Sequence, residues 1–323
     1  MDVGVYFDLR NPPASGRSSS HLYGFTLEMC EEAERLGAHS IWVSEHHLFD
    51  DGYLPRPLTF AAAIAARTQR VRIGTAILIG PLHSAPEIAE DAAVVDLISD
   101  GRLELGLGAG YRVPEFELYG ADPAARYAVN DDRARELRAI WAEGRVTPAP
   151  VQERVPIWMG YLGPKGARRA GRLGEGLLTP NAAMLAPYRE GLAEGGHDPA
   201  TARMAGGVQA WITDDPEADW PVVRPHLAYQ LDSYRRHMVE GTDHPTPRPV
   251  DPERVRQQAL DGALRGFLHG TPADAADAIR RLTAGAPVET AYIFASIGGM
   301  PDDLVARHVQ LICQKLGPLL ADA

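Results

Sequence analysis

Residues 71–108 read VRIGTAILIGPLHSAPEIAEDAAVVDLISDGRLELGLG, and this stretch decides the fold. Two apolar runs of strand length, VRIGTAILIG and RLELGLG, enclose a segment in which Ile88, Ala92 and Val95 recur at the spacing of one helical face. An Asp-Gly pair then turns the chain into the second run. Strands that are apolar throughout are typical of parallel sheets covered by helices. The stretch therefore predicts a strand–helix–strand unit.

The same alternation continues along the chain in both directions. The other expected strands are VGVYF, HSIWVS, VPIWMG, GLLT, GGVQAWIT and TAYIFA. Helical segments stand between them, including one predicted over residues 129–143, and residues 216–263 predict a helical excursion with loops after the seventh strand. Eight such units favour a (β/α)8 TIM barrel formed as one domain by residues 1–323. A doubly wound open sheet is the rival architecture.

Composition narrows the class of protein. The 323 residues are 45% hydrophobic and 23% charged, which is typical of a globular protein with a large core. A formal charge of −11 argues against a nucleic-acid partner, because phosphates require a basic face. Cys30 and Cys313 stand among apolar helical positions and predict buried free thiols. We see neither a signal peptide nor an apolar run of about 18 residues, so we expect a cytoplasmic protein without a membrane span.

The second strand ends on the densest cluster of titratable groups, Glu45-His46-His47. In a barrel the active site lies at the C-terminal ends of the strands. Adjacent strand residues point to opposite faces, so the two histidines are not expected to bind one metal ion, and we predict no metal site. His46 is the candidate acid, base or hydrogen-bond donor, whereas His47 is more typical of a packing histidine.

The ends of the third and fourth strands carry small residues. Ala76 and Ile77 would let a flat ring lie close to the backbone, although a plain barrel core explains them equally well. His83, on the following loop, is as typical of a surface histidine as of a functional one. The run GLGAGYR resembles a dinucleotide fingerprint only superficially, because its spacing is G-x-G-x-G and the following VPEF is not expected to open a helix. Its glycines instead predict close approach of a ligand to the backbone.

The fifth strand leads into GYLGPKGARRAG, where small residues precede an expected helix and Lys165 stands at its entrance. The N–H groups of a helix N-terminus, together with a lysine, can bind an anion or a phosphate. A tight turn without a ligand is the alternative. Arg126, at the entrance of another helix, is a second candidate phosphate partner, with a surface arginine as the alternative.

Taken in order, VGVYF, SIWVSEHH, VRIGTAILIGPLHSAP, DGRLELGLGAGYRVPEFELYG and VPIWMG with GARRAGRLGEG resemble the bacterial-luciferase-like flavin monooxygenases over residues 1–180. The resemblance implies a (β/α)8 barrel that binds reduced FMN (FMNH2) at the strand ends. There O2 adds at the flavin C4a position, and the resulting peroxyflavin oxygenates a small organic substrate. It also implies a separate NAD(P)H:flavin reductase and pairing into a homodimer.

The resemblance also assigns residues. His46 matches the catalytic histidine of the EHH motif, and Glu45 matches the acid that supports it by hydrogen bonding. Positions that match neighbours of the flavin or its phosphate are Ala76, Ile77, Gly108, Ala109, Arg126, Tyr161, Leu162 and Gly163. The chain departs from luciferase at Ala109 and at Tyr161-Leu162, so further candidates for holding the phosphate are Arg112, Lys165 and the amides of residues 163–166, including Gly163 and Gly166. The family often has a nonprolyl cis peptide at this turn.

Two other functions stay open on the same fold. One is an oxidoreductase that transfers hydride with a deazaflavin coenzyme, although in those enzymes the second strand commonly ends in D-H rather than EHH. The other is a non-catalytic, flavin-binding accessory subunit. The loops after strands one, two and seven are the predicted lid over the site. The sequence does not identify the organic substrate.

Overall fold

The computed structural model describes residues 1–251, 254–255 and 267–321. Eight parallel strands form the barrel: β1 (Asp2–Phe7), β2 (Ser40–Val43), β3 (Arg72–Thr75), β5 (Leu103–Gly108), β6 (Ile157–Met159), β7 (Gly176–Leu178), β8 (Met204–Ile212) and β10 (Val288–Phe294). Each of these strands pairs with the next, and β10 pairs with both β8 and β1, which closes the sheet. The (β/α)8 prediction is confirmed, and the open doubly wound sheet is excluded.

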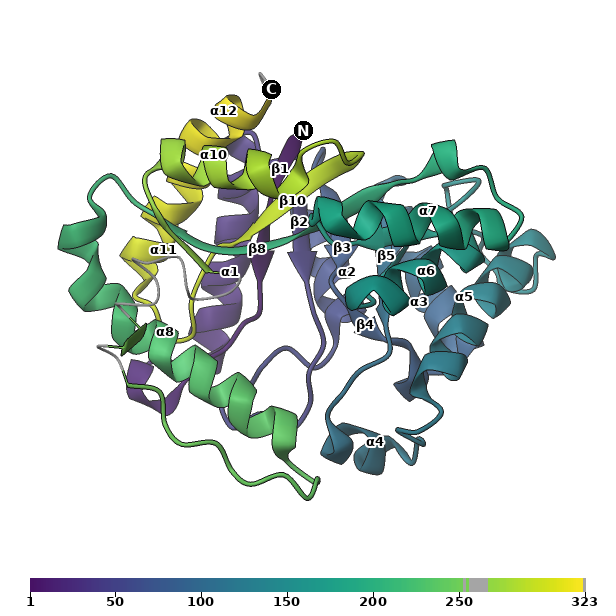
Figure 1. Ribbon diagram of the computed structural model, residues 1–323, viewed down its shortest axis with the longest axis horizontal. Coiled ribbons are helices and arrows are strands. Elements are labelled where there is room, and N and C mark those ends of the chain that lie inside the picture. The colour runs from purple at the N-terminus through teal and green to yellow at the C-terminus, as the bar shows by residue number, and fades with distance from the viewer. Residues whose placement is uncertain (252–253, 256–266, 322–323) are drawn as a thin grey trace.

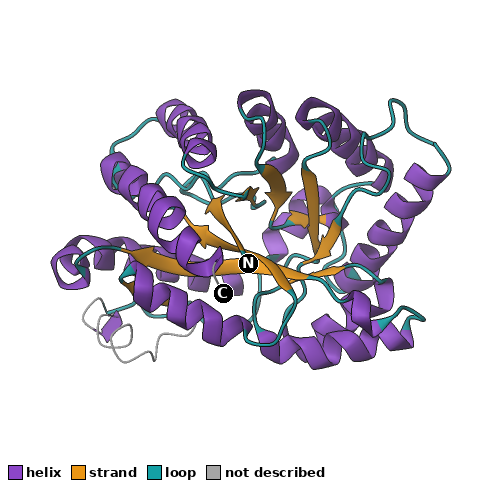
Figure 2. Cartoon of the chain, turned by 90° about the horizontal axis from the view of Figure 1, so that it is seen from above, coloured by secondary structure: helices purple, strands orange, loops and turns teal. Residues whose placement is uncertain are grey.

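Helices surround the strands on the outside (Figure 2). They are α1 (Ser19–Arg35), α2 (Pro57–Arg67), α3 (Ala85–Ser99), α5 (Arg126–Ala142), α6 (Gly163–Leu173), α7 (Leu185–Glu194), α8 (Pro216–Val239), α10 (Pro272–Thr283), α11 (Asp302–Leu311) and α12 (Gly317–Ala321). Local sequence explains several boundaries. Ser84 caps α3 by accepting a hydrogen bond from the Glu87 N–H, and Thr271 forms a capping box with Asp274 at the start of α10.

Several elements differ from the sequence-based expectation. A short helix, α4 (Val113–Tyr119), does open at VPEF, because a proline is tolerated in the first turn of a helix. Two short strands, β4 (Leu78–Ile79) and β9 (Phe267–Gly270), pair with the ends of β5 and β8. The predicted helix over 129–143 begins earlier, at Arg126. The excursion predicted over 216–263 opens with the 24-residue α8, and its residues 252–253 and 256–263 lie outside the described residues.

Aromatic side chains fill the inside of the barrel. Trp42 stacks on Tyr292 with ring centroids 4.8 Å apart, and the same buried cluster contains Tyr6 and Trp158. Gly74 makes room for this layer, because a Cβ atom there would lie 2.1 Å from the Trp42 ring. A separate, larger apolar core lies between the barrel and its helices. The aromatic layer separates a hollow at the N-terminal ends of the strands from the cavity at their C-terminal ends.

The two ends of the barrel carry different elements. The chain termini lie at one end, while α4 and α8 lie beyond the opposite end, which the strands reach with their C-termini (Figure 1). Cys30 and Cys313 are buried and free, as predicted. Within the described residues, no helix combines the length and the apolar character needed to cross a membrane.

Candidate active site

A cavity of about 340 Å³ opens at the C-terminal ends of the strands. That volume falls within the range of pockets that bind small molecules and cofactors. Eight residues singled out from the sequence lie in its wall: Glu45, His46, Ala76, Ile77, Gly108, Ala109, Tyr161 and Leu162. Five other candidates lie outside the lining: Arg112, Arg126, Gly163, Lys165 and Gly166. Most of the strand ends chosen by sequence reasoning therefore meet around one space.

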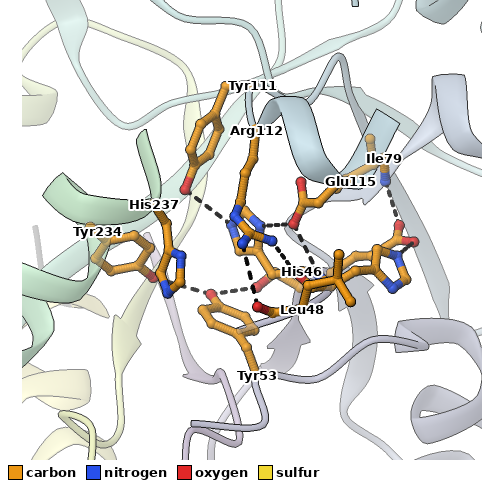
Figure 3. A network of polar contacts seen from close by, with 12 residues as sticks. His46, Leu48, Tyr53, Ile79, Tyr111, Arg112, Glu115, Tyr234 and His237 are labelled. Carbon is orange, nitrogen blue, oxygen red and sulfur yellow. Dashed lines mark hydrogen bonds and ion pairs between the residues drawn. The ribbon is translucent and has the colours of Figure 1, made fainter. Parts of the chain in front are cut away.

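His46 is held by a carboxylate from a distant part of the chain. Its Nδ1 lies 2.8 Å from Oε1 of Glu115, a fully buried residue on α4 (Figure 3). The same oxygen accepts a hydrogen bond from the His47 backbone N–H at 2.9 Å. The Glu115 carboxylate favours the tautomer in which Nδ1 carries the proton, because the carboxylate accepts hydrogen bonds. Nε2, whose partner is the Tyr111 hydroxyl at 3.5 Å, is then the ring nitrogen that can accept a proton.

Glu45 serves other partners than His46. One of its oxygens lies 2.8 Å from Nε2 of His47 and 2.7 Å from Nε2 of His83, and the other accepts from the Ile79 backbone N–H at 2.6 Å. Burial is the largest single effect and raises the pKa of this carboxyl, but the hydrogen bonds from His47, His83 and the Ile79 N–H and the attraction of His83 together hold the pKa below its usual value. Glu45 is therefore an ionised buried group that fixes the backbone after β3.

The other two histidines are packing residues in this structure. His47 and His83 are 6% exposed each, and both rings contact Glu45 and Tyr119. The interpretation of His47 as a packing histidine agrees with this position. The surface interpretation of His83 is wrong, because the loop that carries it folds back against β2.

The residues after β3 lie so close to the ends of β5 and β6 that only glycine fits at two positions there. A Cβ atom on Gly108 would lie 2.5 Å from the Ile77 side chain, and one on Gly160 would lie 2.4 Å from it. The absence of a side chain at these glycines makes room for the Ile77 side chain. The prediction that the glycines after the fourth strand serve the close approach of a ligand to the backbone is corrected accordingly. The nonprolyl cis peptide joins Ala76 to Ile77, not the residues of the turn after the fifth barrel strand.

The far end of the cavity adjoins the start of α6. The α6 N-terminus has no side-chain cap, and Lys165 on its first turn is exposed. Arg126 lies over the ring of Tyr127, a wall residue, at 4.8 Å from the ring centroid. Its Nε is buried and has no hydrogen-bond partner among the described residues. Its Nη1 donates to the Pro123 oxygen at 2.7 Å, so only part of the guanidinium group has a partner. A buried guanidinium nitrogen without a partner, together with the uncapped α6 N-terminus, fits a phosphate.

Arg112 is not available for such a role. It is 2% exposed and donates to the backbone oxygens of His47 and Leu48 and to the carboxylate of Glu240 (Figure 3). Its phosphate-binding assignment is therefore wrong. The arginine instead joins the loop after β2 to the residue that follows α8.

Sequence reasoning missed four wall or near-wall residues that surround His46: Tyr53, Tyr111, Glu115 and Tyr234. Tyr53 is buried and Tyr234 is partly buried, and their hydroxyls lie 3.1 Å apart. Glu115 could have been noticed as the only acid in the run GLGAGYRVPEF, directly after the fourth barrel strand. Tyr234 offered no local signal, because it stands in the middle of an ordinary amphipathic helix.

The fold and the cavity define a class: a (β/α)8 barrel with one small-molecule site at the strand ends, built around a histidine–carboxylate pair. The luciferase-like monooxygenase family matches residues 1–289. The chain belongs to this family.

Individual relatives narrow the comparison. The oxygenase component of the flavin-dependent trigonelline monooxygenase of Acinetobacter baylyi is 36% identical over 165 residues, 46% of each chain. An F420-dependent glucose-6-phosphate dehydrogenase of Amycolatopsis mediterranei is 30% identical over 186 residues, 51% of this chain and 56% of the relative. The crystal structure of the monooxygenase RslO1 from Streptomyces bottropensis aligns with a TM-score of 0.80 at 24% identity, covering 98% of this chain and 99% of that one. The matched segments span about half the length of the curated relatives.

Proposed function

We propose that the chain is the oxygenase component of a two-component flavin monooxygenase. It would bind FMNH2 delivered by a separate NAD(P)H:flavin reductase and use O2 to oxygenate a small organic substrate. The observation that carries the proposal is the shape of the cavity: a smooth apolar side made by Ala76, Ile77 and Ala109, beside a histidine held by a buried carboxylate. The related oxygenase component from Acinetobacter baylyi supports the need for a reductase partner.

The residues fit FMN at both of its ends. The isoalloxazine ring would lie against Ala76, Ile77, Gly108 and Ala109, while the phosphate would meet the Tyr161–Gly166 turn and Arg126. When bound, reduced FMN supplies the electrons that activate O2. His46 would hold or move a proton at its Nε2, which is the ring nitrogen not engaged by Glu115. Glu45 would hold the backbone that carries Ile77 and Ile79 in place.

The cavity also has to exclude water while the reaction proceeds. The loops after β1 and β2 and the helix α8 would form that cover. Arg10 in the first loop binds Asp51 in the second at 2.7 Å, and both side chains are fully buried. Tyr229 on α8 donates to the same Asp51 at 3.0 Å.

Pairing of two chains and a cytoplasmic location belong to the same proposal. Pairing is supported by α3, which exposes Val94, Leu97 and Ile98 by 40–46%. The location rests on the two buried free thiols, which suit a reducing compartment.

A deazaflavin-dependent oxidoreductase is the second candidate, favoured by the relative that uses F420. The same cavity side and the same histidine would serve hydride transfer. The EHH end of β2 supports FMN over this alternative. Titration of the protein with FMN and with the deazaflavin distinguishes the two candidate functions. A monooxygenase should bind FMN more tightly, whereas a deazaflavin-dependent oxidoreductase should bind the deazaflavin more tightly.

Rapid mixing tests the monooxygenase reading directly. The anaerobic protein–FMNH2 complex is mixed with oxygenated buffer, and absorbance is followed. We expect an absorbing species that persists for seconds and differs from free oxidised FMN. Immediate appearance of free oxidised FMN, with no such species, would contradict the proposal.

A further inference from the structure

Four hydroxyl groups meet in the wall of the cavity. They belong to Tyr6 on β1, Ser44 after β2, Tyr53 in the following loop and Tyr234 on α8. The Tyr6 hydroxyl contacts Ser44 Oγ and lies 2.7 Å from the Tyr53 hydroxyl, which in turn lies 2.9 Å from Ser44 Oγ and 3.1 Å from the Tyr234 hydroxyl. We call these four residues the hydroxyl cluster. They come from three separate segments of the chain, so the fold, not local sequence, assembles them.

The hydroxyl cluster adjoins the apolar side of the cavity. Its members stand on β1, after β2 and on α8, and in the closed strand order β1 and β2 come directly before β3 and β5, whose ends carry the apolar side. His46 borders the cluster, because its ring centroid lies 4.7 Å from that of Tyr53 in an edge contact. A substrate bound beside a flavin ring that lies on Ile77 would therefore be within reach of both His46 and the hydroxyls.

The charges behind the cluster disfavour an anion there. Burial raises the pKa of Tyr6, Tyr53 and Tyr234 well above the usual tyrosine value, so these groups keep their protons and can donate. Arg10 pairs with Asp51, and the second buried acid of this region, Asp8, accepts from the Arg10 backbone N–H through Oδ1 while its Oδ2 has no partner among the described residues. Hydroxyls both donate and accept, so the cluster can turn one O–H toward an incoming oxygen.

We propose that the hydroxyl cluster binds an uncharged oxygen of the organic substrate, a carbonyl or a hydroxyl, and thereby orients the substrate beside His46. This inference rests on the proposed function for its setting. It assigns the substrate class: a neutral oxygen-bearing molecule whose remaining surface is apolar. A carboxylate in the same position would lose the solvation of its charge and would stand near the buried Asp8, whose charge also raises the pKa of the three tyrosines.

The experiment uses four probes on the protein loaded with oxidised FMN: acetophenone, phenol, ethylbenzene and benzoate. Binding is read from the perturbed flavin absorbance. We expect acetophenone, phenol or both to bind about tenfold more tightly than ethylbenzene, the size of one hydrogen bond, and benzoate to bind weakly. The comparison of acetophenone with phenol tells a carbonyl from a hydroxyl. Carbonyl-labelled acetophenone should show a lowered C=O stretching frequency in the infrared.

Matched variants separate the cluster from a general effect of tyrosine loss. Tyr53→Phe and Tyr234→Phe should abolish the preference over ethylbenzene and restore the free C=O frequency. Tyr188→Phe is the control, because its buried hydroxyl donates to the Glu175 backbone oxygen and stands outside the cavity wall. Melting curves verify that all variants are folded.

Equal binding of acetophenone, phenol and ethylbenzene to the wild-type protein would overturn the inference, as would a preference that survives both cluster variants. Tightest binding of benzoate would overturn it too. If FMN itself fails to bind, the proposed function fails, and the same probes are then measured on the flavin-free protein by equilibrium dialysis, which still tests the hydroxyl cluster.

Discussion

At the scale of single residues, His46 and Glu115 form the pair on which the proposed chemistry depends. The hydrogen bond of 2.8 Å between them fixes which ring nitrogen faces the cavity. We expect His46→Ala to leave FMN affinity nearly unchanged and to lower turnover by about 10²- to 10⁴-fold, the usual contribution of a general acid or base. The turnover of Glu115→Gln should lie between that of the wild-type protein and that of His46→Ala, because the amide oxygen of Gln can still accept a hydrogen bond from Nδ1. Product yield per FMNH2 and FMN affinity are the measurements.

His39→Ala is the matched control for this prediction, because that histidine is 41% exposed at the opposite end of the barrel. It should behave as the wild-type protein. A product yield unchanged in His46→Ala would remove the residue from the mechanism.

Asp8 gives a second prediction at this scale. The residue is 1% exposed, and burial raises the pKa of its carboxyl to about 6. The folded-state pKa exceeds the unfolded value of about 3.9, so the folded protein binds more protons between these values, and stability is lost as pH rises through that window. The cost above pH 6 is about 3 kcal/mol. Asp8→Asn should therefore raise the free energy of unfolding at pH 7.5 by up to that amount, with little change near pH 4.

Urea unfolding at the two pH values measures this difference. The Asn side chain keeps the acceptor for the Arg10 N–H, which lies 3.2 Å from Asp8 Oδ1. The same gain at both pH values would mean that burial of the charge is not its cause.

At the scale of elements, the apolar runs predicted all eight barrel strands, because parallel strands covered on both faces leave a strong local signature. The predictions failed where a short element depends on its neighbours. The helix α4 has only seven residues and begins with Val113-Pro114, and β9 has only four. Such segments carry too few residues for a periodic pattern, and their pairing with other elements stabilises them.

The helix entrances of α5 and α6 carry the third prediction. If Arg126 and the α6 N-terminus bind a phosphate, Arg126→Gln should weaken FMN binding about tenfold, as expected for one charge-assisted hydrogen bond. Riboflavin, which lacks the phosphate, should bind the variant and the wild-type protein alike. Lys165→Gln tests the exposed lysine in the same assay. An equal loss for FMN and riboflavin would place the effect on the ring and not on the phosphate.

His308 joins three elements and carries the fourth prediction. On α11, its Nε2 accepts from the Ile212 N–H of β8 at 3.0 Å, and its Nδ1 lies 3.0 Å from the Ala295 oxygen after β10. Burial lowers its pKa to about 4. The unfolded chain, with a pKa of about 6.5, binds more protons between these values, so stability is complete above pH 6.5 and falls by about 3 kcal/mol as pH decreases toward 4.

His308→Gln should flatten this dependence while lowering stability at pH 7. Urea unfolding of both proteins from pH 4 to pH 7 gives the comparison. A slope that persists in the variant would assign the pH dependence to other groups.

At the scale of the whole molecule, the limits of sequence reasoning follow from distance along the chain. His46 was found because it ends a strand, yet its partner Glu115 lies 69 residues away, and Tyr53 and Tyr234 are 181 residues apart. Arg112 was misjudged for the same reason, since its carboxylate partner is 128 residues away. Local patterns place residues at the strand ends, but they do not tell which neighbours saturate a charge and which leave it free for a ligand.

The cover of the cavity provides the last prediction, because it joins segments from all parts of the chain. Glu240, just after α8, binds Arg112 at 2.5 Å and lies 2.8 Å from Nδ1 of His237, while Arg112 also holds the loop after β2. Glu240 is 44% exposed, so this tie contributes only about 1 kcal/mol. A cover that opens more often releases its ligand faster. Glu240→Gln should therefore speed FMN dissociation about fivefold, which corresponds to that free energy.

The matched control is Glu289→Gln, because the Glu289 side chain is 44% exposed, as that of Glu240 is, and pairs with Arg203 at the other end of the barrel. It should leave the dissociation rate unchanged, while neither variant shifts the melting temperature by more than a few degrees. Displacement of bound FMN, followed by fluorescence after mixing with excess competitor, measures both rates. If the two variants release FMN equally fast, the ion pair at Glu240 does not restrain the cover, and the buried Arg10–Asp51 pair between the loops after β1 and β2 is the next tie to test.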